Sequence, residues 1–329
     1  MTIEIKTAKL DSVRNTFGHI KRRFGDKPAT RYQEATYDIA AQTNFHYKPL
    51  WDQDHELNDP SKTAVVMADW YALKDPRQFY YGTYVQNRAK MQENAENNYG
   101  FFEKRNLANK LPENIRETII KHMIPLRHVE QAANLNNMFC TSNANYCTAV
   151  AQATLFEAMD RFGAAQYFSR IGLLLDNNTG DTLSEAKQEW MNNPSWQGLR
   201  AYCEKTLTIK DWFETFIAQD IVLDSLINNL YYTQMDAWLN DNGGADISML
   251  TEFMSERAKD SSRWSDFMLK TVCAESEENK NQVKSWISTW RIHAQSALEP
   301  LASAMLGDNA LAEAFASLEA RLKKIGIAD

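Results

Sequence analysis

The side chains best suited to chemistry are acidic ones within two long stretches of helical periodicity. In residues 126–168 and 208–273, apolar residues recur every three or four positions. Both stretches also carry scattered carboxylates, namely Glu130, Glu157, Asp160, Glu214, Asp220, Asp224, Glu252, Glu256 and Asp260. Carboxylates that project into a helix bundle are the ligands of di-iron and di-manganese centres. The first question is therefore whether this chain holds a metal.

A di-iron bundle centre needs more than carboxylates. One glutamate must come from each of two helices, and a Glu-x-x-His motif from each of the other two. No histidine lies between residues 129 and 292, where most of the predicted bundle falls. None of the six histidines has glutamate three positions before it: His19, His46, His55, His122, His128 and His293. The imidazole half of the ligand set is therefore absent from the sequence.

Basic residues stand beside the carboxylates. Arg161 follows Asp160, while Arg257 and Lys259 follow Glu256. A positive side chain neutralises an inward carboxylate by charge-assisted hydrogen bonding. We expect at least one buried replacement pair, with Asp160–Arg161 as the candidate. The alternative is ordinary exposed helix charges, which stabilise a fold very little.

Motifs for other chemistries are also missing. The sequence has no phosphate-binding loop, dinucleotide-binding glycine pattern, nucleophile elbow or zinc-ligand spacing. His128 and Glu130 are two residues apart, so in a helix they point to different faces. We predict no catalytic, cofactor-binding or metal-binding residue on this chain.

Composition favours long helices. The 329 residues are 44% hydrophobic but include only 12 glycines and 8 prolines, which disfavours a β-sandwich. Nine tryptophans and 13 tyrosines point either to a large interface or to a large helical core. The formal net charge of −7 argues against nucleic acid as a partner.

Cellular location follows from what the sequence lacks. There is no apolar run of membrane-spanning length, and the first residues have no apolar core of a secretion signal. The four cysteines show no paired spacing, and in helices they behave as small apolar residues. We expect a cytoplasmic protein without membrane contact.

Two regions differ in pattern. Residues 1–60 lack a sustained helical period and contain three prolines, so they predict an extended N-terminal arm. Residues 61–329 predict a helical domain, with one helix beginning at Asp75-Pro76 and another at Pro112. A turn near 141–145 would divide the first long stretch into a hairpin. We expect partner contacts from the arm and its junction: Arg22, Arg23, Tyr47, Trp51, Trp70, Phe79 and Tyr80.

Two segments carry a family resemblance. RYQEATYDIAAQTNFHYKPLWDQDHELNDP (31–60) and TAVVMADWYALKDPRQFYYGTYVQNRAKMQ (63–92) resemble, in the expected order, the oxygenase beta subunit of bacterial multicomponent phenol hydroxylases. Toluene monooxygenase and soluble methane monooxygenase beta subunits are related to it. The resemblance covers the whole chain.

The resemblance implies an all-α, ferritin-like long-helix bundle whose metal ligands have been lost. It implies an oxygenase that is a dimer of alpha, beta and gamma heterotrimers, served by a small effector protein and a reductase. FAD and a [2Fe-2S] cluster in the reductase would pass electrons from NADH, and the di-iron centre of the alpha subunit would convert phenol to catechol. This chain would be a non-catalytic structural subunit.

Residue by residue, the resemblance implies little. Glu130 and Asp220 match the two lone glutamate ligands, while Asp160 and Glu256 fall where Glu-x-x-His would stand, so all four are degenerate ligand positions. Two rival functions remain: a stand-alone metal enzyme with a carboxylate-only site, and a helical interaction scaffold unrelated to oxygenation. Metal analysis would identify the first rival, and the co-purifying proteins would identify the second.

Overall fold

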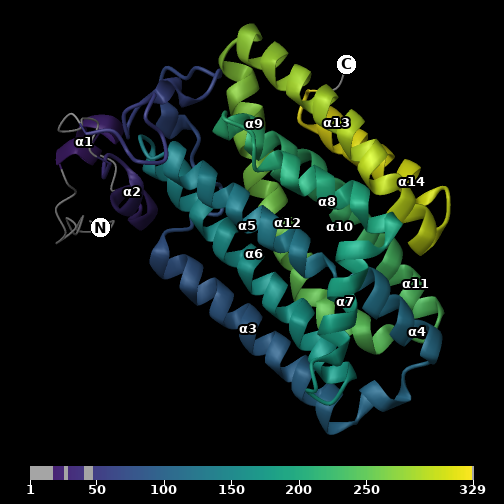
Figure 1. Ribbon diagram of the computed structural model, residues 1–329. Helices are drawn as coiled ribbons and strands as arrows, with labels where there is room; N and C mark the ends of the chain where they lie inside the picture. The colour runs from purple at the N-terminus through teal and green to yellow at the C-terminus, as the bar shows by residue number, and fades with distance from the viewer. Residues whose placement is uncertain (1–17, 26–28, 41–46, 328–329) are drawn as a thin grey trace, which may run out of the picture.

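The described part of the chain is built from helices. The computed structural model describes residues 18–25, 29–40 and 47–327, and no strand occurs among them (Figure 1). The predicted all-α class is therefore confirmed. None of the described helices combines the length and the apolar character that crossing a membrane requires.

The region predicted as an extended arm contains two short helices in its described residues, α1 (Gly18–Phe24) and α2 (Arg31–Thr36). Thr30 and Gln33 form a reciprocal capping box that starts α2, a local signal that a search for long periodicity overlooks. Tyr32 on α2 is buried, and its Oη accepts a hydrogen bond from the backbone N–H of Asp75 at 2.7 Å, which links this region to the helical body. The short 3₁₀ turns η1 (Pro60–Lys62) and η2 (Trp70–Ala72) lead into the bundle.

The first long helix, α3 (Tyr81–Lys104), begins later than Asp75-Pro76 predicts. The Asp75 carboxylate accepts the backbone N–H of Arg77 and pairs with its guanidinium, and Gln78 adopts a left-handed φ of 54°. These features form a turn, so Asp75 does not cap a helix. After η3 (Leu107–Lys110), Pro112 precedes the helical run α4 (Glu113–Thr118) and the π-helical η4 (Ile119–Met123), as predicted.

Two long hairpins form the centre of the fold. The first is α5 (Leu126–Asn143) with α6 (Thr148–Leu175), and its turn lies where the polar interruption predicts it. The second joins a continuous helical run to α12 (Ala245–Glu275). That run consists of α9 (Trp212–Phe216), η5 (Ile217–Leu223), α10 (Asp224–Asn229), η6 (Leu230–Met235) and α11 (Asp236–Asp241). Its segments η5 and η6 are π-helical, a feature that is frequent at functional sites.

Four further helices cover the hairpins: α7 (Asp181–Asn192), α8 (Pro194–Thr206), α13 (Glu277–Leu306) and α14 (Ala310–Lys324). Helix α8 approaches α13 closely at Gly198, where an added Cβ would lie 2.7 Å from the backbone oxygen of Ala297. Glycine is therefore required at this crossing. Trp196, Trp212 and Trp264 are fully buried, so these large aromatics belong to the core and not to an interface.

Candidate functional site

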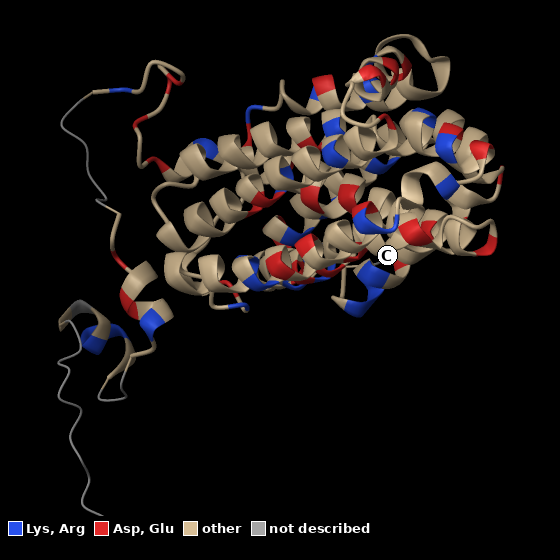
Figure 2. Cartoon of the chain, turned by 90° about the horizontal axis from the view of Figure 1, so that it is seen from below, with Lys and Arg blue, Asp and Glu red and all other residues tan. Residues whose placement is uncertain are grey.

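Six charged side chains meet inside the bundle formed by the two hairpins. Four are carboxylates and two are guanidinium groups, and none is more than 6% exposed. Figure 2 shows acidic and basic residues along the middle of the long helices as well as at their ends. This charge cluster consists of Glu130 on α5, Glu157 and Arg161 on α6, Asp220 on η5, Asp224 on α10 and Arg257 on α12.

The guanidinium of Arg161 lies at the centre of this charge cluster. Its Nε is 2.9 Å from Glu157 Oε1, and its Nη1 is 3.4 Å from Glu130 Oε2. Its Nη2 pairs with Asp224 and is 3.7 Å from Asp220 Oδ1. The guanidinium of Arg161 thus contacts carboxylates from α5, η5 and α10, in addition to Glu157 on its own helix.

Arg257 supplies the second positive charge. Its Nη1 donates to Glu157 Oε1 at 2.9 Å, and the hydroxyl of Ser261 donates to the other oxygen of that carboxylate. Burial would raise the pKa of Glu157, but Arg161 and Arg257 outweigh it and lower the value to about 2. Glu157 is therefore the firmly ionised member of the cluster.

Asp220 and Asp224 lie one turn apart and have weaker support. Asp220 Oδ1 accepts from Asn137 Nδ2 at 3.1 Å, and Asp224 Oδ1 accepts from Gln219 Nε2 at 2.9 Å. Burial and the negative charge of Asp224 raise the pKa of Asp220 well above its ordinary value. Burial also raises the pKa of Asp224, to about 6, although Arg161 opposes that rise. The two residues are thus the members of the charge cluster most ready to hold a proton.

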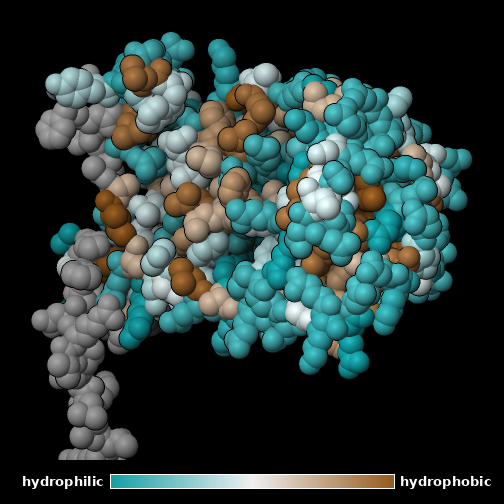
Figure 3. Space-filling view, turned by 60° about the horizontal axis from the view of Figure 1, so that its bottom comes forward, coloured by the Kyte–Doolittle hydropathy of each residue, from teal (hydrophilic) through white to brown (hydrophobic). Residues whose placement is uncertain are grey.

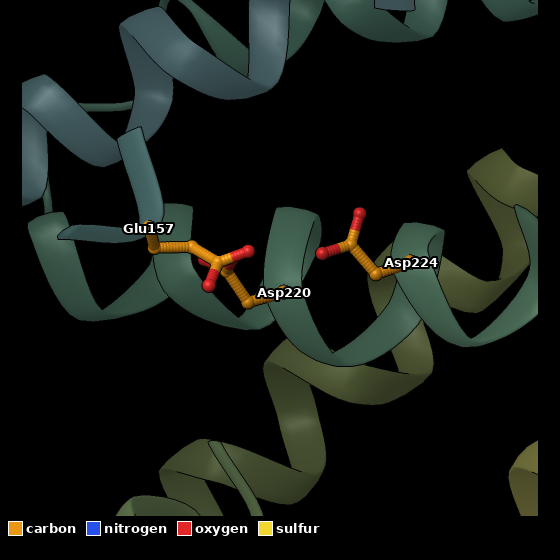
Figure 4. A group of neighbouring side chains, drawn as sticks. All are labelled: Glu157, Asp220 and Asp224. Atoms are coloured by element: carbon orange, nitrogen blue, oxygen red, sulfur yellow. The ribbon is translucent and has the colours of Figure 1, made fainter. Parts of the chain in front are cut away.

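The geometry superficially suits a metal. Oxygen atoms of Glu157, Asp220 and Asp224 lie within 4.8 Å of one another, and Figure 4 shows the three side chains converging from neighbouring helices. The space between them, however, already contains the positively charged group of Arg161. The imidazole ligands of a di-iron bundle site are also missing from these helices. The residues present therefore do not fit a di-iron centre.

Two of the four degenerate ligand positions face this charge cluster and two do not. Glu130 and Asp220 lie in it. Asp160 is buried but points elsewhere, and Glu256 is exposed, so its expected inward position is wrong. Two members of the charge cluster, Glu157 as the partner of Arg161 and Asp224, were not among the predicted site residues. The i, i+4 spacing of Glu157/Arg161 and of Asp220/Asp224 is the signal that could have found them, because it puts side chains on one helix face.

Asp160 belongs to a second ion-pair group, with α3. Its carboxylate accepts from Arg88 Nη2 at 2.6 Å and from the Tyr84 hydroxyl at 2.9 Å. Arg88 also reaches Asp260 at 3.4 Å. The expected Asp160–Arg161 pair is therefore wrong, since neighbours in a helix point about 100° apart and each finds a partner on a different helix. The broader expectation of a buried replacement pair is met by Arg161 and Arg257.

His128, in the first turn of α5, is not directed at this charge cluster. Its ring stacks on Trp190 with centroids 5.5 Å apart, and burial together with Arg127 lowers its pKa to about 4. Neutral and stacked, it serves packing.

The seven residues expected to contact partners divide into three groups. Arg22, Tyr47 and Trp51 are exposed, with Tyr47 at 80% and Trp51 at 68%. Arg23 is also exposed, but it forms ion pairs with Asp38 and Asp69. The remaining three do not project freely: Phe79 is buried, and Trp70 and Tyr80 pack against the core.

The first hairpin leaves an apolar surface uncovered. Five large apolar side chains on it are between 42% and 51% exposed: Leu135, Met138, Leu155, Met159 and Phe162. Their spacing of three, four and seven residues places them along one face of each helix. In Figure 3, hydrophobic residues gather over the left half of the view, beside a mostly hydrophilic right half. We call these five residues the hairpin face.

Comparison with known proteins shows similarity over nearly the whole chain. The model of the methane/phenol/alkene hydroxylase family matches residues 51–276. The oxygenase component DmpL of phenol 2-monooxygenase from Pseudomonas sp. (strain CF600) is 51% identical over 99% of this chain and 98% of its own length. The corresponding component MhpL from Acinetobacter pittii is 48% identical with the same coverage.

Solved structures show the same similarity. Phenol hydroxylase from Pseudomonas sp. OX1 contains a chain that is 51% identical and superposes with a TM-score of 0.93, covering 99% of both chains. A chain of toluene 4-monooxygenase is 21% identical and superposes with a TM-score of 0.79, covering 90% of this chain and 99% of its own; at that identity only the fold is shared.

Proposed function

Because this chain belongs to the methane/phenol/alkene hydroxylase family, we propose that it is the non-catalytic beta subunit of a phenol 2-monooxygenase oxygenase component. The oxygenase would be a dimer of alpha, beta and gamma heterotrimers in the cytoplasm. Its alpha subunit would hold the di-iron centre that converts phenol to catechol. A small effector protein and a reductase with FAD and a [2Fe-2S] cluster would serve it, with NADH as the electron source.

The single observation that carries this proposal is the position of Arg161. Where an iron centre would require metal ions between carboxylates, this chain has a guanidinium that contacts Glu157, Glu130 and Asp224. An internal cation neutralises the carboxylates that the ferritin-like bundle retains, and it stabilises the fold without providing any redox chemistry. The role left to this chain is to bind and support its partners.

The hairpin face is the best-supported partner surface. Large apolar side chains that are exposed together on one face of a protein usually mark a protein–protein contact. Phe162 and Met159 are aromatic and flexible apolar anchors of the kind enriched at interfaces. The exposed Tyr47 and Trp51 would add a second contact from the N-terminal region, with Arg22 beside it.

The test is co-purification of this chain with the alpha and gamma subunits, using matched surface variants. Phe162→Glu places a charge in the hairpin face and should abolish co-purification. Ile292→Glu is the control, because Ile292 is 66% exposed on α13, away from that face. Equal recovery of the complex with both variants would remove the hairpin face from the proposal.

Metal content then separates the proposal from its rival. The complex should carry iron and form catechol with NADH, whereas the separately purified chain should carry no stoichiometric iron or manganese. If the chain were instead a stand-alone carboxylate metal enzyme, the separately purified chain would carry stoichiometric iron or manganese. Deletion of residues 1–50 should weaken the complex while leaving the helical body; an unchanged complex would show that the N-terminal region is dispensable for assembly.

A further inference from the structure

A small polar cavity adjoins the charge cluster. Its volume is about 10 Å³, close to the smallest space that holds one water molecule. Helices α12, α10 and η5 supply its walls: Asp220, Asp224, Asn228, Ser261, Ser262, Trp264 and Ser265. Such a space, surrounded by hydroxyl, amide and carboxyl groups, is suited to water and unsuited to an apolar ligand.

Two of these lining residues have complementary unsatisfied atoms. The indole Nε1 of Trp264 is fully buried and has no hydrogen-bond partner among the described residues, and neither has Asp220 Oδ2. An indole N–H only donates, whereas a carboxylate oxygen accepts. A water molecule satisfies both groups at once, by accepting from Trp264 and donating to Asp220. A metal ion would leave the indole N–H without an acceptor.

A second, larger pocket borders this cavity. It has a volume of about 290 Å³ between the second hairpin and α14, and it shares the residues Asn228 and Ser262 with the small cavity. Its other walls are mainly hydroxyl, amide and basic groups, including Ser225, Asn229, Tyr232, Thr233, Ser255, Lys259, Ser317 and Arg321. Asn228 and Ser262 therefore stand between the outer pocket and the buried carboxylates.

The charge balance calls for a further positive charge. Four ionised carboxylates would exceed the two guanidinium groups by two negative charges in a site without solvent screening, which is costly. A proton bound by one of the carboxylates would reduce this excess. The groups that interact with Asp220 are Asn137 and Cys140 on α5, Glu157 and Arg161 on α6 and Asp224 on α10. Glu130 on α5, Tyr232 on η6 and Arg257 on α12 interact with the neighbouring members of the charge cluster.

We propose that the small cavity is a binding site for one ordered water, which joins Trp264 to Asp220, and that the charge cluster exchanges a proton with solvent through it. The proton passes between the water and Asp220 Oδ2, and the outer pocket supplies it at Asn228 and Ser262. When Asp220 is ionised the water donates to Oδ2; when Asp220 is protonated its O–H donates to the water. This proposal is independent of the function proposed above.

Infrared spectroscopy of the full chain tests it. At neutral pH, the wild-type spectrum should contain the C=O stretching band of a buried protonated carboxyl group, and Asp220→Asn should remove that band. In D₂O the band should shift at once, because the passage exchanges the proton without unfolding. Absence of the band, or a shift only as slow as that of the core amides, would overturn the proposal.

A pair of serine variants tests whether protons enter the small cavity from the outer pocket at Ser262. Ser262→Val places an apolar side chain between cavity and pocket and should slow the isotope shift of the Asp220 band. Ser255→Val is the control, since Ser255 lies two turns earlier on α12 and lines the outer pocket but not the small cavity. Equal rates in the two variants would show that protons do not enter at Ser262. Should either variant fold poorly, Trp264→Phe offers a second measurement, since loss of the indole donor should shift the frequency of the Asp220 band.

Discussion

Replacing Arg161 by methionine is the sharpest perturbation of the charge cluster. The substitution keeps an unbranched side chain of similar length but removes the cation that contacts Glu130, Glu157 and Asp224. Arg257 remains, and among the described residues its ion pair is with Glu157. The buried carboxylates on the other helices would then face one another without a counter-ion.

The magnitude follows from burial. Removing one partner of a buried, hydrogen-bonded ion pair costs about 3–5 kcal/mol, because an uncompensated charge stays in the interior. Arg161 and each carboxylate it contacts have side chains no more than 9% exposed, so solvent screening relieves little of this. Since about 1 kcal/mol lowers the melting temperature of a large domain by roughly 2 °C, we expect a fall of roughly 6–10 °C.

The assay is thermal and urea unfolding of the full chain at pH 7, followed by circular dichroism in the presence of EDTA. The chelator matters because a cluster without its guanidinium could recruit a divalent cation. Arg263→Met is the control: Arg263 is 66% exposed and lies 3.7 Å from Asp260, so its loss should cost at most about 1 kcal/mol. Equal melting temperatures for the two variants would refute the view that Arg161 neutralises the charge cluster.

Two further predictions concern packing and pH. Gly198→Ala should destabilise the chain by about 1–3 kcal/mol in urea unfolding, because the new Cβ would meet the backbone of Ala297. The control Gly163→Ala should be neutral or stabilising, because nothing lies within 4 Å of the position of its Cβ. Equal effects of the two substitutions would mean that α8 and α13 are not in close contact. The pKa of Asp224 is raised to about 6 in the folded chain, whereas it is near 4 in the unfolded chain, so the folded state binds the proton more tightly. The stability that this proton binding contributes is therefore complete below about pH 4 and is lost as the pH rises through about 6. The melting temperature of Asp224→Asn relative to wild type should therefore increase between pH 4 and pH 7, and a constant or falling difference would contradict this assignment.

Much of the fold could be predicted because local signals mark its boundaries. The proline before α4 begins a helix where expected, and the hairpin turn expected near 141–145 lies at 144–147. The start of α3 could not be predicted, since Asp75-Pro76 is a valid cap signal that Arg77 diverts into a turn by a side-chain contact. Such a contact depends on conformation and leaves no periodic pattern.

The charge cluster was only partly predictable for a similar reason. Helical periodicity shows that two carboxylates share a face, but it does not show which face meets the other helices. Glu256 and Arg257 are adjacent on α12, and only the packing shows that Arg257 turns inward while Glu256 stays in solvent. Substituting both Asp160 and Arg161 by leucine, which the expected pair would tolerate, should now be strongly destabilising, because each residue leaves a different buried partner unpaired.

We propose that the guanidinium of Arg161 stands where a metal would otherwise be held, and that the metal chemistry belongs to a partner subunit. Anomalous diffraction at the iron absorption edge, from crystals of the assembled oxygenase, tests this most directly because it locates each iron in space. We predict iron peaks in the partner subunit and none among Glu157, Asp220 and Asp224, with Arg161 in clear density between them. An iron peak among these three carboxylates would show that this chain holds the metal itself.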